Sequence, residues 1–124
     1  MTSMPMEVLD WTRGEEGIAY QACPTCGGLW YFRRTFCPRC GRSHPEDRQS
    51  SGVGTVHAVT LVTRAPGEEL RAHAPYLIAL IDTDEGFRLM AHGDRTLRIG
   101  DRVRARFVTL AGRLMPHFER IADQ

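Results

Sequence analysis

Four cysteines arranged as two C-P-x-C-G pentapeptides constrain this chain more than any other feature of its sequence. Two cysteines that flank two residues can bind one ion from a single tight turn. Proline restricts φ directly after the leading cysteine, and glycine can adopt the positive φ that closes the turn. The repeat therefore predicts one four-thiolate metal site. The pentapeptides are Cys23-Pro24-Thr25-Cys26-Gly27 and Cys37-Pro38-Arg39-Cys40-Gly41, and the chain contains no other cysteine.

Three interpretations of Cys23, Cys26, Cys37 and Cys40 remain open. Structural zinc is favoured because four protein thiolates leave no coordination position for a substrate. Iron in a rubredoxin-like site is the second, since similar knuckles hold iron for electron transfer. Disulfides are the third, and they are disfavoured because the first 20 residues show no secretory signal pattern. His44 follows closely, but the four thiolates complete the shell, so we expect His44 to be solvated.

Length and charge narrow the class of protein. A chain of 124 residues is about one typical domain. No apolar run approaches the ~20 residues that a membrane span requires, so we expect a soluble, cytoplasmic protein. The formal net charge is +1, and acidic residues are interspersed with basic ones. This balance disfavours a nucleic-acid-binding protein, because neutralising phosphates needs a stronger positive field.

The first part of the chain is expected to form a lead, a ribbon and a linker. Residues 1–16 are predicted to be a short, partly helical lead. Ile18–Ala22 shows the period-two alternation of a strand that leads into the first knuckle, and Leu29–Phe32 is predicted to be the return strand. These strands and the two knuckles place the zinc ribbon at residues 17–42. So small a ribbon cannot bury a self-sufficient core and depends on its ion. The polar segment 43–51 contains a proline and no apolar anchor, so it is predicted to be a linker.

In residues 52–124 the sequence pattern is that of strands separated by short turns, and no stretch shows a convincing helical period. Five strands with one long connection fit an OB-fold barrel. We therefore predict an all-β protein in which an N-terminal rubredoxin-like zinc ribbon is followed by a five-stranded OB-fold barrel. The expected strands are Gly52–Thr63, Tyr76–Asp82, Phe87–Ala91, Arg102–Leu110 and Arg113–Arg120.

No catalytic constellation is visible. The long connection 64–75 carries His73, but no acid or nucleophile accompanies it in sequence. The chain shows no Ser/His/Asp order, no phosphate-cradling glycine loop and no H-E-x-x-H. The other histidines, His57, His92 and His117, are likewise isolated.

Two groups of residues are candidates for contact with a partner. Trp30, Tyr31 and Phe32 either form the small core of the ribbon or stack on a ligand or partner, and some of them must face outward because a ribbon has one protected face. Arg102, Arg104 and Arg106 alternate with apolar residues, so one strand face carries three guanidinium groups. That face is either solvated or contacts an anion or partner, since guanidinium pairs bidentately with phosphate and carboxylate.

The order of these motifs resembles a family of small bacterial and archaeal proteins that join a rubredoxin-like zinc ribbon to an OB-fold and are associated with acyl-CoA metabolism. The resemblance covers most of the chain. It rests on the two knuckles preceded by Tyr20-Gln21-Ala22, then Gly52–Val56, Ala74–Asp82 and Leu97–Val103. Each piece alone is weak, but the ordered set is specific.

The resemblance implies a non-catalytic accessory subunit that binds and supports a thiolase-fold enzyme. That enzyme would be a thiolase or a retro-aldolase acting on acyl-CoA thioesters, including those of steroid side chains, and the small subunit would help to hold CoA. Residues 1–16 are shorter than the helical lead of many relatives, which favours partner binding over direct CoA bridging. A nucleic-acid-binding ribbon with an OB module and a rubredoxin-like electron carrier remain as alternatives.

Overall fold

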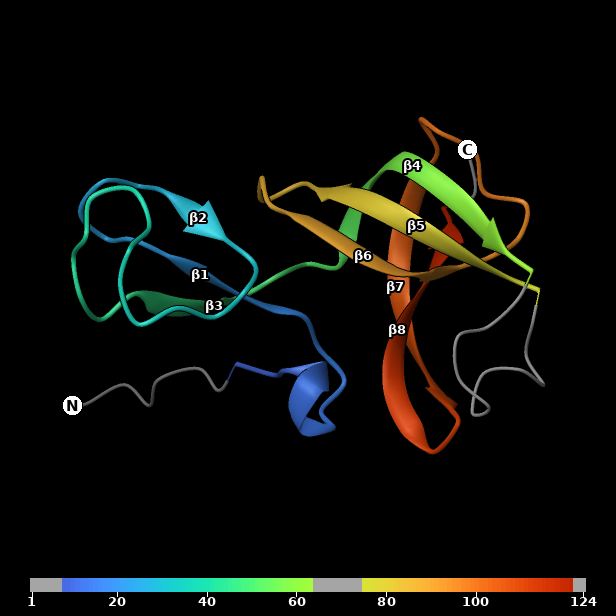
Figure 1. The fold of residues 1–124 in the computed structure, drawn as a ribbon, viewed down its shortest axis with the longest axis horizontal. Helices are drawn as coiled ribbons and strands as arrows, with labels where there is room; N and C mark the ends of the chain where they lie inside the picture. Colours follow the sequence, from blue (N-terminus) through green and yellow to red (C-terminus); the bar gives the residue numbers. More distant parts are fainter. Residues whose placement is uncertain (1–7, 64–74, 122–124) are drawn as a thin grey trace.

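The computed structural model describes residues 8–63 and 75–121, which form a three-stranded ribbon beside a closed five-stranded barrel (Figure 1). The strand order is β2-β1-β3 in the ribbon and β4-β5-β6-β8-β7 around the barrel. The prediction of an all-β fold with a five-stranded barrel is confirmed, and the described residues contain no α-helix. In this part of the chain no helix has the length and apolarity needed to cross a bilayer.

The central strand of the ribbon, β1 (Ala19–Ala22), is buried at all four positions. It pairs antiparallel with β2 (Leu29–Trp30) on one side and with β3 (Glu46–Gln49) on the other. A strand covered in this way has little access to water, and its one polar side chain with an amide group, Gln21, is hydrogen-bonded to Trp30 and Asp47. The return strand is shorter than the predicted Leu29–Phe32, because the chain turns away from β1 after Trp30.

The prediction that residues 43–51 are a linker is wrong for Glu46–Gln49, which form β3. All four residues of β3 are in register with β1, from Ala19 opposite Gln49 to Ala22 opposite Glu46. Backbone hydrogen bonds hold an edge strand of this kind, and its largely exposed side chains can be entirely polar. The ribbon sheet therefore extends to Gln49.

The lead contains one turn of 3-10 helix, η1 (Trp11–Arg13), which begins later than the helical turns expected within residues 1–16. Asp10 caps it by accepting a hydrogen bond from the Thr12 amide at 2.9 Å. Gln49 attaches the lead to the ribbon: its side chain accepts from the Leu9 amide at 2.6 Å and donates to the Leu9 carbonyl at 3.1 Å. The same amide nitrogen donates to the Ile18 carbonyl at 3.0 Å.

The barrel has the strand arrangement of an OB-fold, in which the third and fifth strands run parallel. Here β6 and β8 form that parallel pair, and the other neighbours are antiparallel. A register shift between Val56 and Ala58 bends β4 and helps the barrel to close. The barrel strands are β4 (Val53–Val62), β5 (Tyr76–Thr83), β6 (Arg88–Gly93), β7 (Arg102–Leu110) and β8 (Arg113–Arg120). The loop with His73 lies outside the described residues.

The ribbon and the barrel share one hydrophobic core. Tyr20 of β1 stacks on Phe87 at 4.8 Å between ring centroids, and Tyr31 stacks on the same ring at 5.7 Å. Ile18 and Tyr20 belong to the same buried cluster as Phe118 inside the barrel. The β5–β6 hairpin, which carries Phe87, points from the barrel towards the ribbon (Figure 1). This hairpin joins the two modules.

Candidate metal centre and partner-binding surface

The ribbon brings all four cysteines together. Their Sγ atoms lie within 4.8 Å of one another, and the pairs Cys23–Cys40 and Cys26–Cys37 are 3.6 Å apart. Bonds of ~2.3 Å to one tetrahedral ion require sulfur atoms about 3.8 Å apart. The four thiol groups therefore fit one tetrahedral metal ion.

Each knuckle is closed as its glycine predicts. The amide of Gly27 donates to the Cys23 carbonyl at 3.0 Å, and that of Gly41 donates to the Cys37 carbonyl at 2.9 Å. Gly27 has a φ of 76° and Gly41 a φ of 80°, in the left-handed region that glycine adopts without strain. Each turn thus brings its two cysteines into the common cluster of four sulfur atoms.

Backbone amides favour the thiolate form of Cys37. Burial of Cys37 acts to raise its pKa, but donation from the Cys40 and Arg39 amides, at 3.4 and 3.3 Å from Sγ, and contacts with other thiols outweigh it and lower the pKa to about 6. The pKa of Cys23 is also lowered, chiefly by the Cys26 amide. Donation from the Arg42 amide acts to lower the pKa of Cys40, but hydrogen bonds with Cys23 and the other thiols and burial outweigh it and raise the pKa to about 11. The backbone therefore favours the metal-binding thiolate form at one cysteine of each knuckle, Cys23 and Cys37.

Of the three candidate aromatic residues, two have structural roles. The Trp30 indole donates to Gln21 Oε1 at 2.8 Å, and Gln21 is buried in β1. Tyr31 stacks on Phe87 and accepts a hydrogen bond from the Trp11 indole at 2.9 Å. Burial raises the pKa of the Tyr31 hydroxyl, which stays neutral. Phe32 differs from both because 77% of its surface is exposed.

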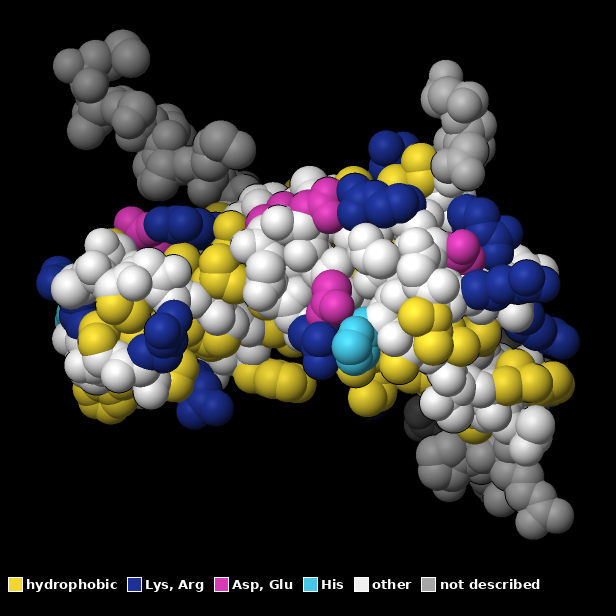
Figure 2. Space-filling view, turned by 90° about the horizontal axis from the view of Figure 1, so that it is seen from above, with side chains coloured by type: hydrophobic (Ala, Val, Ile, Leu, Met, Phe, Trp, Pro, Cys, Tyr) yellow, Lys and Arg dark blue, Asp and Glu magenta, His cyan; other side chains and the backbone are white. Residues whose placement is uncertain are grey.

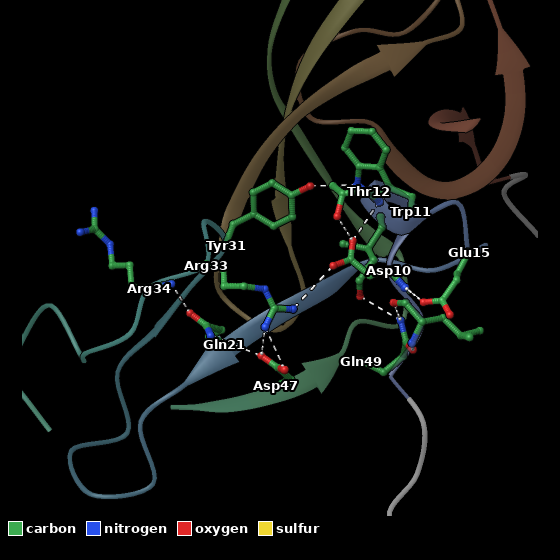
Figure 3. Close-up of polar contacts among 12 residues, drawn as sticks. Asp10, Trp11, Thr12, Glu15, Gln21, Tyr31, Arg33, Arg34, Asp47 and Gln49 are labelled. Atoms are coloured by element: carbon green, nitrogen blue, oxygen red, sulfur yellow. Dashed lines mark hydrogen bonds and ion pairs between the residues drawn. The ribbon is translucent and has the colours of Figure 1, made fainter. Parts of the chain in front are cut away.

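A polar network holds the loop that carries these aromatic residues (Figure 3). Gln21 Oε1 accepts from the Arg34 amide at 2.6 Å. The Arg33 guanidinium donates to both oxygens of Asp47, at 3.0 and 3.1 Å, and lies 3.6 Å from Asp10. Arg33 therefore connects the lead to β3 across the loop.

This loop, η1 and β6 enclose a hollow of about 360 Å³, which we call the junction groove. Met90 of β6 is 67% exposed at its margin. The alternation along residues 87–91 indicates that Met90 faces outward, but only the fold places it opposite the ribbon. Sequence reasoning did not identify Trp11 or Met90 as site residues. The groove is lined by Asp10, Trp11, Thr12, Ala19, Tyr20, Gln21, Tyr31, Phe32, Arg33 and Met90.

The three candidate arginines lie on β7, on the exposed face that the alternation predicts, but two of them have acidic neighbours in the barrel. Arg102 donates to both carboxylate oxygens of Asp84 at 2.7 and 2.8 Å, and this bond lowers the pKa of Asp84. Arg106 lies 3.4 Å from Glu119. Arg104 has no acidic partner among the described residues. These three arginines therefore carry less unpaired positive charge than their sequence pattern indicates.

Two histidines pair with acids, but neither pair is accompanied by a nucleophile in these contacts. His117 Nε2 lies 2.7 Å from Asp94, and His57 Nδ1 lies 3.4 Å from Asp82, which also accepts from Arg88 at 2.6 Å. Seen from above, a histidine with acidic and basic neighbours borders the hydrophobic side chains of the barrel face (Figure 2). These contacts build no catalytic set.

Two archaeal relatives are named DUF35 domain-containing scaffold proteins. The one from Methanothermobacter thermautotrophicus is 30% identical over 86 residues, which are 65% of this chain and 64% of that protein. The one from Methanocaldococcus jannaschii is 37% identical over 68 residues, which are 54% of this chain and 48% of that protein. This chain thus aligns with about half to two thirds of the length of these relatives.

Two solved structures share the fold. A structure described as "Ltp2-ChsH2(DUF35) aldolase" superposes with a TM-score of 0.74 at 20% identity and covers 97% of this chain and 98% of that chain. A DUF35-family protein of unknown function from Sulfolobus solfataricus gives a TM-score of 0.57 at 17% identity, over 85% of this chain and 76% of that chain.

The family match covers half of the chain. Residues 47–108 match the family described as ChsH2, C-terminal OB-fold domain. These residues include β4, β5 and β6, and they end within β7. The chain therefore belongs to the ChsH2 C-terminal OB-fold family.

Proposed function

We propose that this protein is a non-catalytic accessory subunit that binds and supports a thiolase-fold enzyme acting on acyl-CoA thioesters. The enzyme is a thiolase or a retro-aldolase, in lipid metabolism or steroid side-chain degradation. The observation that carries the proposal is the exposed apolar edge of the junction groove, where Phe32 and Met90 are 77% and 67% exposed. The scaffold names of the relatives and the aldolase named with the ChsH2(DUF35) structure support it.

The metal in this proposal is structural zinc. Four thiolates close the coordination shell, so the ion supplies folding free energy to the ribbon and takes no part in a reaction. A rubredoxin-like iron site has the same ligands and is excluded only by metal analysis, since ferric thiolate is red and zinc thiolate is colourless. Zinc keeps β1 and β2 in place, and these strands position Tyr31 and Phe32.

The candidate contact residues differ in how available their side chains are to the enzyme and to CoA. Phe32 is the main anchor, because Trp30 and Tyr31 are already engaged with Gln21 and Trp11 and support the surface from below. Among the arginines, Arg104 is the freest to meet an acidic partner group or a CoA phosphate, and Arg102 and Arg106 would first have to leave their acids. Rim charges of this kind change association rates more than final affinity.

The test is an assay of the enzyme that co-purifies with the full-length protein, measured on its acyl-CoA substrate with and without this chain. We expect the enzyme to lose solubility or activity without it. Phe32→Ser should weaken the complex by on the order of tenfold or more, as for an interface hot spot. Phe36→Ser is the matched control, because Phe36 is 59% exposed on the ribbon and does not line the groove.

Two results would contradict the proposal. One is turnover of an acyl-CoA by this chain alone. The other is an enzyme that is equally soluble and active in its absence.

A further inference from the structure

The outward side of β5 and β6 is apolar at its centre. Every second residue of β5 is buried in the barrel core, so Ile78 and Leu80 face outward, and both are half-buried. The same alternation on β6 places Met90, which is 67% exposed, directly opposite Leu80. Ala58 of β4 lies opposite Leu80 on its other side. These four side chains form one contiguous apolar surface, which we call the β5–β6 face.

This face lies where other OB-folds bind their ligands. OB-folds bind oligonucleotides and oligosaccharides on the face of their second and third strands. In this barrel the second and third strands are β5 and β6. A face that binds nucleic acid combines positive charge with aromatic side chains on which bases stack. The centre of the β5–β6 face carries aliphatic side chains and a methionine instead, so it suits an apolar partner.

The charged groups on the face compensate one another. At the hairpin end Arg88 donates to Asp82 at 2.6 Å, and His57 Nδ1 lies 3.4 Å from the same carboxylate. At the other end the Tyr76 ring stacks on His92 at 4.8 Å between ring centroids. Seen from above, hydrophobic side chains gather on the barrel between groups of charged ones (Figure 2). The face therefore carries no net charge when its histidines are neutral.

The surroundings of the Tyr76 end contain charges of both signs. Arg95 and Arg106 line a hollow there, and so does Asp94. Glu119 lies 3.4 Å from Arg106. Two cations are thus accompanied by two acids, and Arg104 adds one positive charge on β7, two strands away from β6.

The β5–β6 face continues onto the ribbon at the junction groove. Met90 belongs to the face and lines the groove together with Phe32, which is 77% exposed. Arg33 also lines the groove and is paired with Asp47. Arg34 lines a separate hollow that borders Phe32, and it has no acidic partner within the described part of the chain. Two strongly exposed apolar side chains, one from each module, thus lie on one surface.

The lead borders the groove with charges of both signs. Asp10 lies 3.6 Å from Arg33, and Arg13 is followed in the chain by Glu15 and Glu16. Like the two ends of the β5–β6 face, the lead offers a partner no patch of one sign. Apolar contact is therefore the main interaction that this surface can make.

We propose that the β5–β6 face, with Phe32 at its ribbon end, is the surface that docks on the partner enzyme, and that the enzyme meets it with an apolar, uncharged surface. The proposal rests on the accessory-subunit function and specifies its interface. Met90 and Phe32 insert into hollows of the enzyme surface, and Ile78 and Leu80 form the centre of the contact. An apolar centre with a polar rim is the usual anatomy of a protein interface.

Charges of both signs at Met90 test the proposal most sharply. The full-length, metal-loaded protein and its variants are titrated with the purified enzyme that co-purifies with it, at ~0.15 M salt. Met90→Glu and Met90→Arg should each weaken binding by on the order of tenfold or more, because an apolar interface leaves a charge of either sign unpaired. Ile99→Glu is the matched control and should leave binding unchanged, because Ile99 is 69% exposed but lies in the turn before β7. An unchanged urea midpoint shows that each variant is folded.

Hydroxyl-radical footprinting of the complex gives a readout that needs no substitution. The radicals modify exposed methionine and aromatic side chains, so Met90 and Phe32 should be protected when the enzyme is bound. Phe36 and Ile99 are 59% and 69% exposed, and both should be modified equally in the free protein and in the complex.

Three results would overturn the proposal. The first is enzyme binding that both Met90 variants leave intact, with Met90 unprotected in the footprint. The second is opposite effects of the two variants, because a partner surface that prefers one sign is charged. The third is self-association of the free protein that Met90→Glu abolishes, which would assign the face to a second copy of this chain. Binding that survives both Met90 variants but is lost in Phe32→Ser would reject this face and keep the accessory-subunit function, whereas failure of any enzyme to co-purify would reject both.

Discussion

The shared core predicts that the ribbon and the barrel unfold as one unit, and Phe87 is the residue that tests it. Phe87 is 5% exposed and stacks on Tyr20 and Tyr31, so it contacts two aromatic rings from the ribbon. Phe87→Leu keeps an apolar side chain at this position but removes both ring pairs. Phe118→Leu is the matched control, because Phe118 is fully buried in the same cluster and forms no ring pair among the described residues.

The expected cost follows from the two ring contacts. An aromatic pair contributes about 0.5–1.5 kcal/mol beyond its buried area, so losing two pairs costs about 1–3 kcal/mol. Both variants lose the same side-chain atoms, so the comparison removes the transfer free energy of those atoms. Phe87→Leu should therefore reduce the free energy of unfolding by about 1–3 kcal/mol more than Phe118→Leu does.

Urea unfolding of the metal-loaded protein, followed by two probes, measures this difference. Tryptophan fluorescence reports on the ribbon through Trp30 in β2, and on its junction with the barrel through Trp11 in η1, which contacts β8. Far-ultraviolet circular dichroism reports mainly on the barrel strands. The two transitions should coincide in the native protein and in both variants, with a lower midpoint for Phe87→Leu. If Phe87→Leu moves the fluorescence transition alone and leaves the dichroism midpoint unchanged, the modules unfold separately and the shared-core argument is wrong.

Four further predictions address the metal, the barrel, acid stability and nucleic acid. Purified protein should contain about one zinc per chain by elemental analysis, and stoichiometric iron would contradict this. Cys26→Ser or Cys40→Ser should unfold the ribbon, because the apparent free energy of binding structural zinc is roughly 10–16 kcal/mol. Gly54→Ala should destabilise the barrel by about 1–3 kcal/mol in urea, because a Cβ would lie 2.5 Å from the Asp82 carbonyl oxygen. Arginine partners lower the pKa of Asp82 and Asp84, so these carboxylates stabilise the fold above about pH 4 and lose that contribution as the pH falls through their folded values. Asp84→Asn should therefore flatten the acid side of a plot of urea midpoint against pH, and an unchanged slope would count against the pair. Nucleic acid should bind only weakly at ~0.15 M salt in a shift assay, and submicromolar binding would refute the charge argument.

Local sequence rules predicted the parts of the fold that depend on local geometry. The C-P-x-C-G repeat predicted both knuckles, including the positive φ of Gly27 and Gly41. Alternation predicted the barrel strands, because each strand has one face towards a single core. The ends of β5 and β6 differ from the prediction by one or two residues, since pairing continues past the last apolar position.

The features that were missed depend on contacts between distant parts of the chain. No local pattern marks Glu46–Gln49 as a strand, because its stabilisation comes from hydrogen bonds to β1. The alternating arginines of Arg102–Arg106 have no acidic neighbour in the sequence pattern, and only the fold places Asp84 beside Arg102. Trp11 and Met90 meet at one groove because η1 and β6 are both near the ribbon, which no spacing in the sequence indicates.

The connection between the modules limits how this protein can be divided. Only residues 50–52 separate β3 from β4, and Glu85 of the β5–β6 hairpin accepts from the Ser50 hydroxyl at 2.7 Å and from the Ser51 amide at 2.9 Å. A truncation that begins at residue 52 would leave this carboxylate without both donors and would uncover the Phe87 ring. The isolated barrel should then expose a contiguous apolar surface and aggregate during expression. Any study of the barrel alone would describe a surface that the intact chain never exposes.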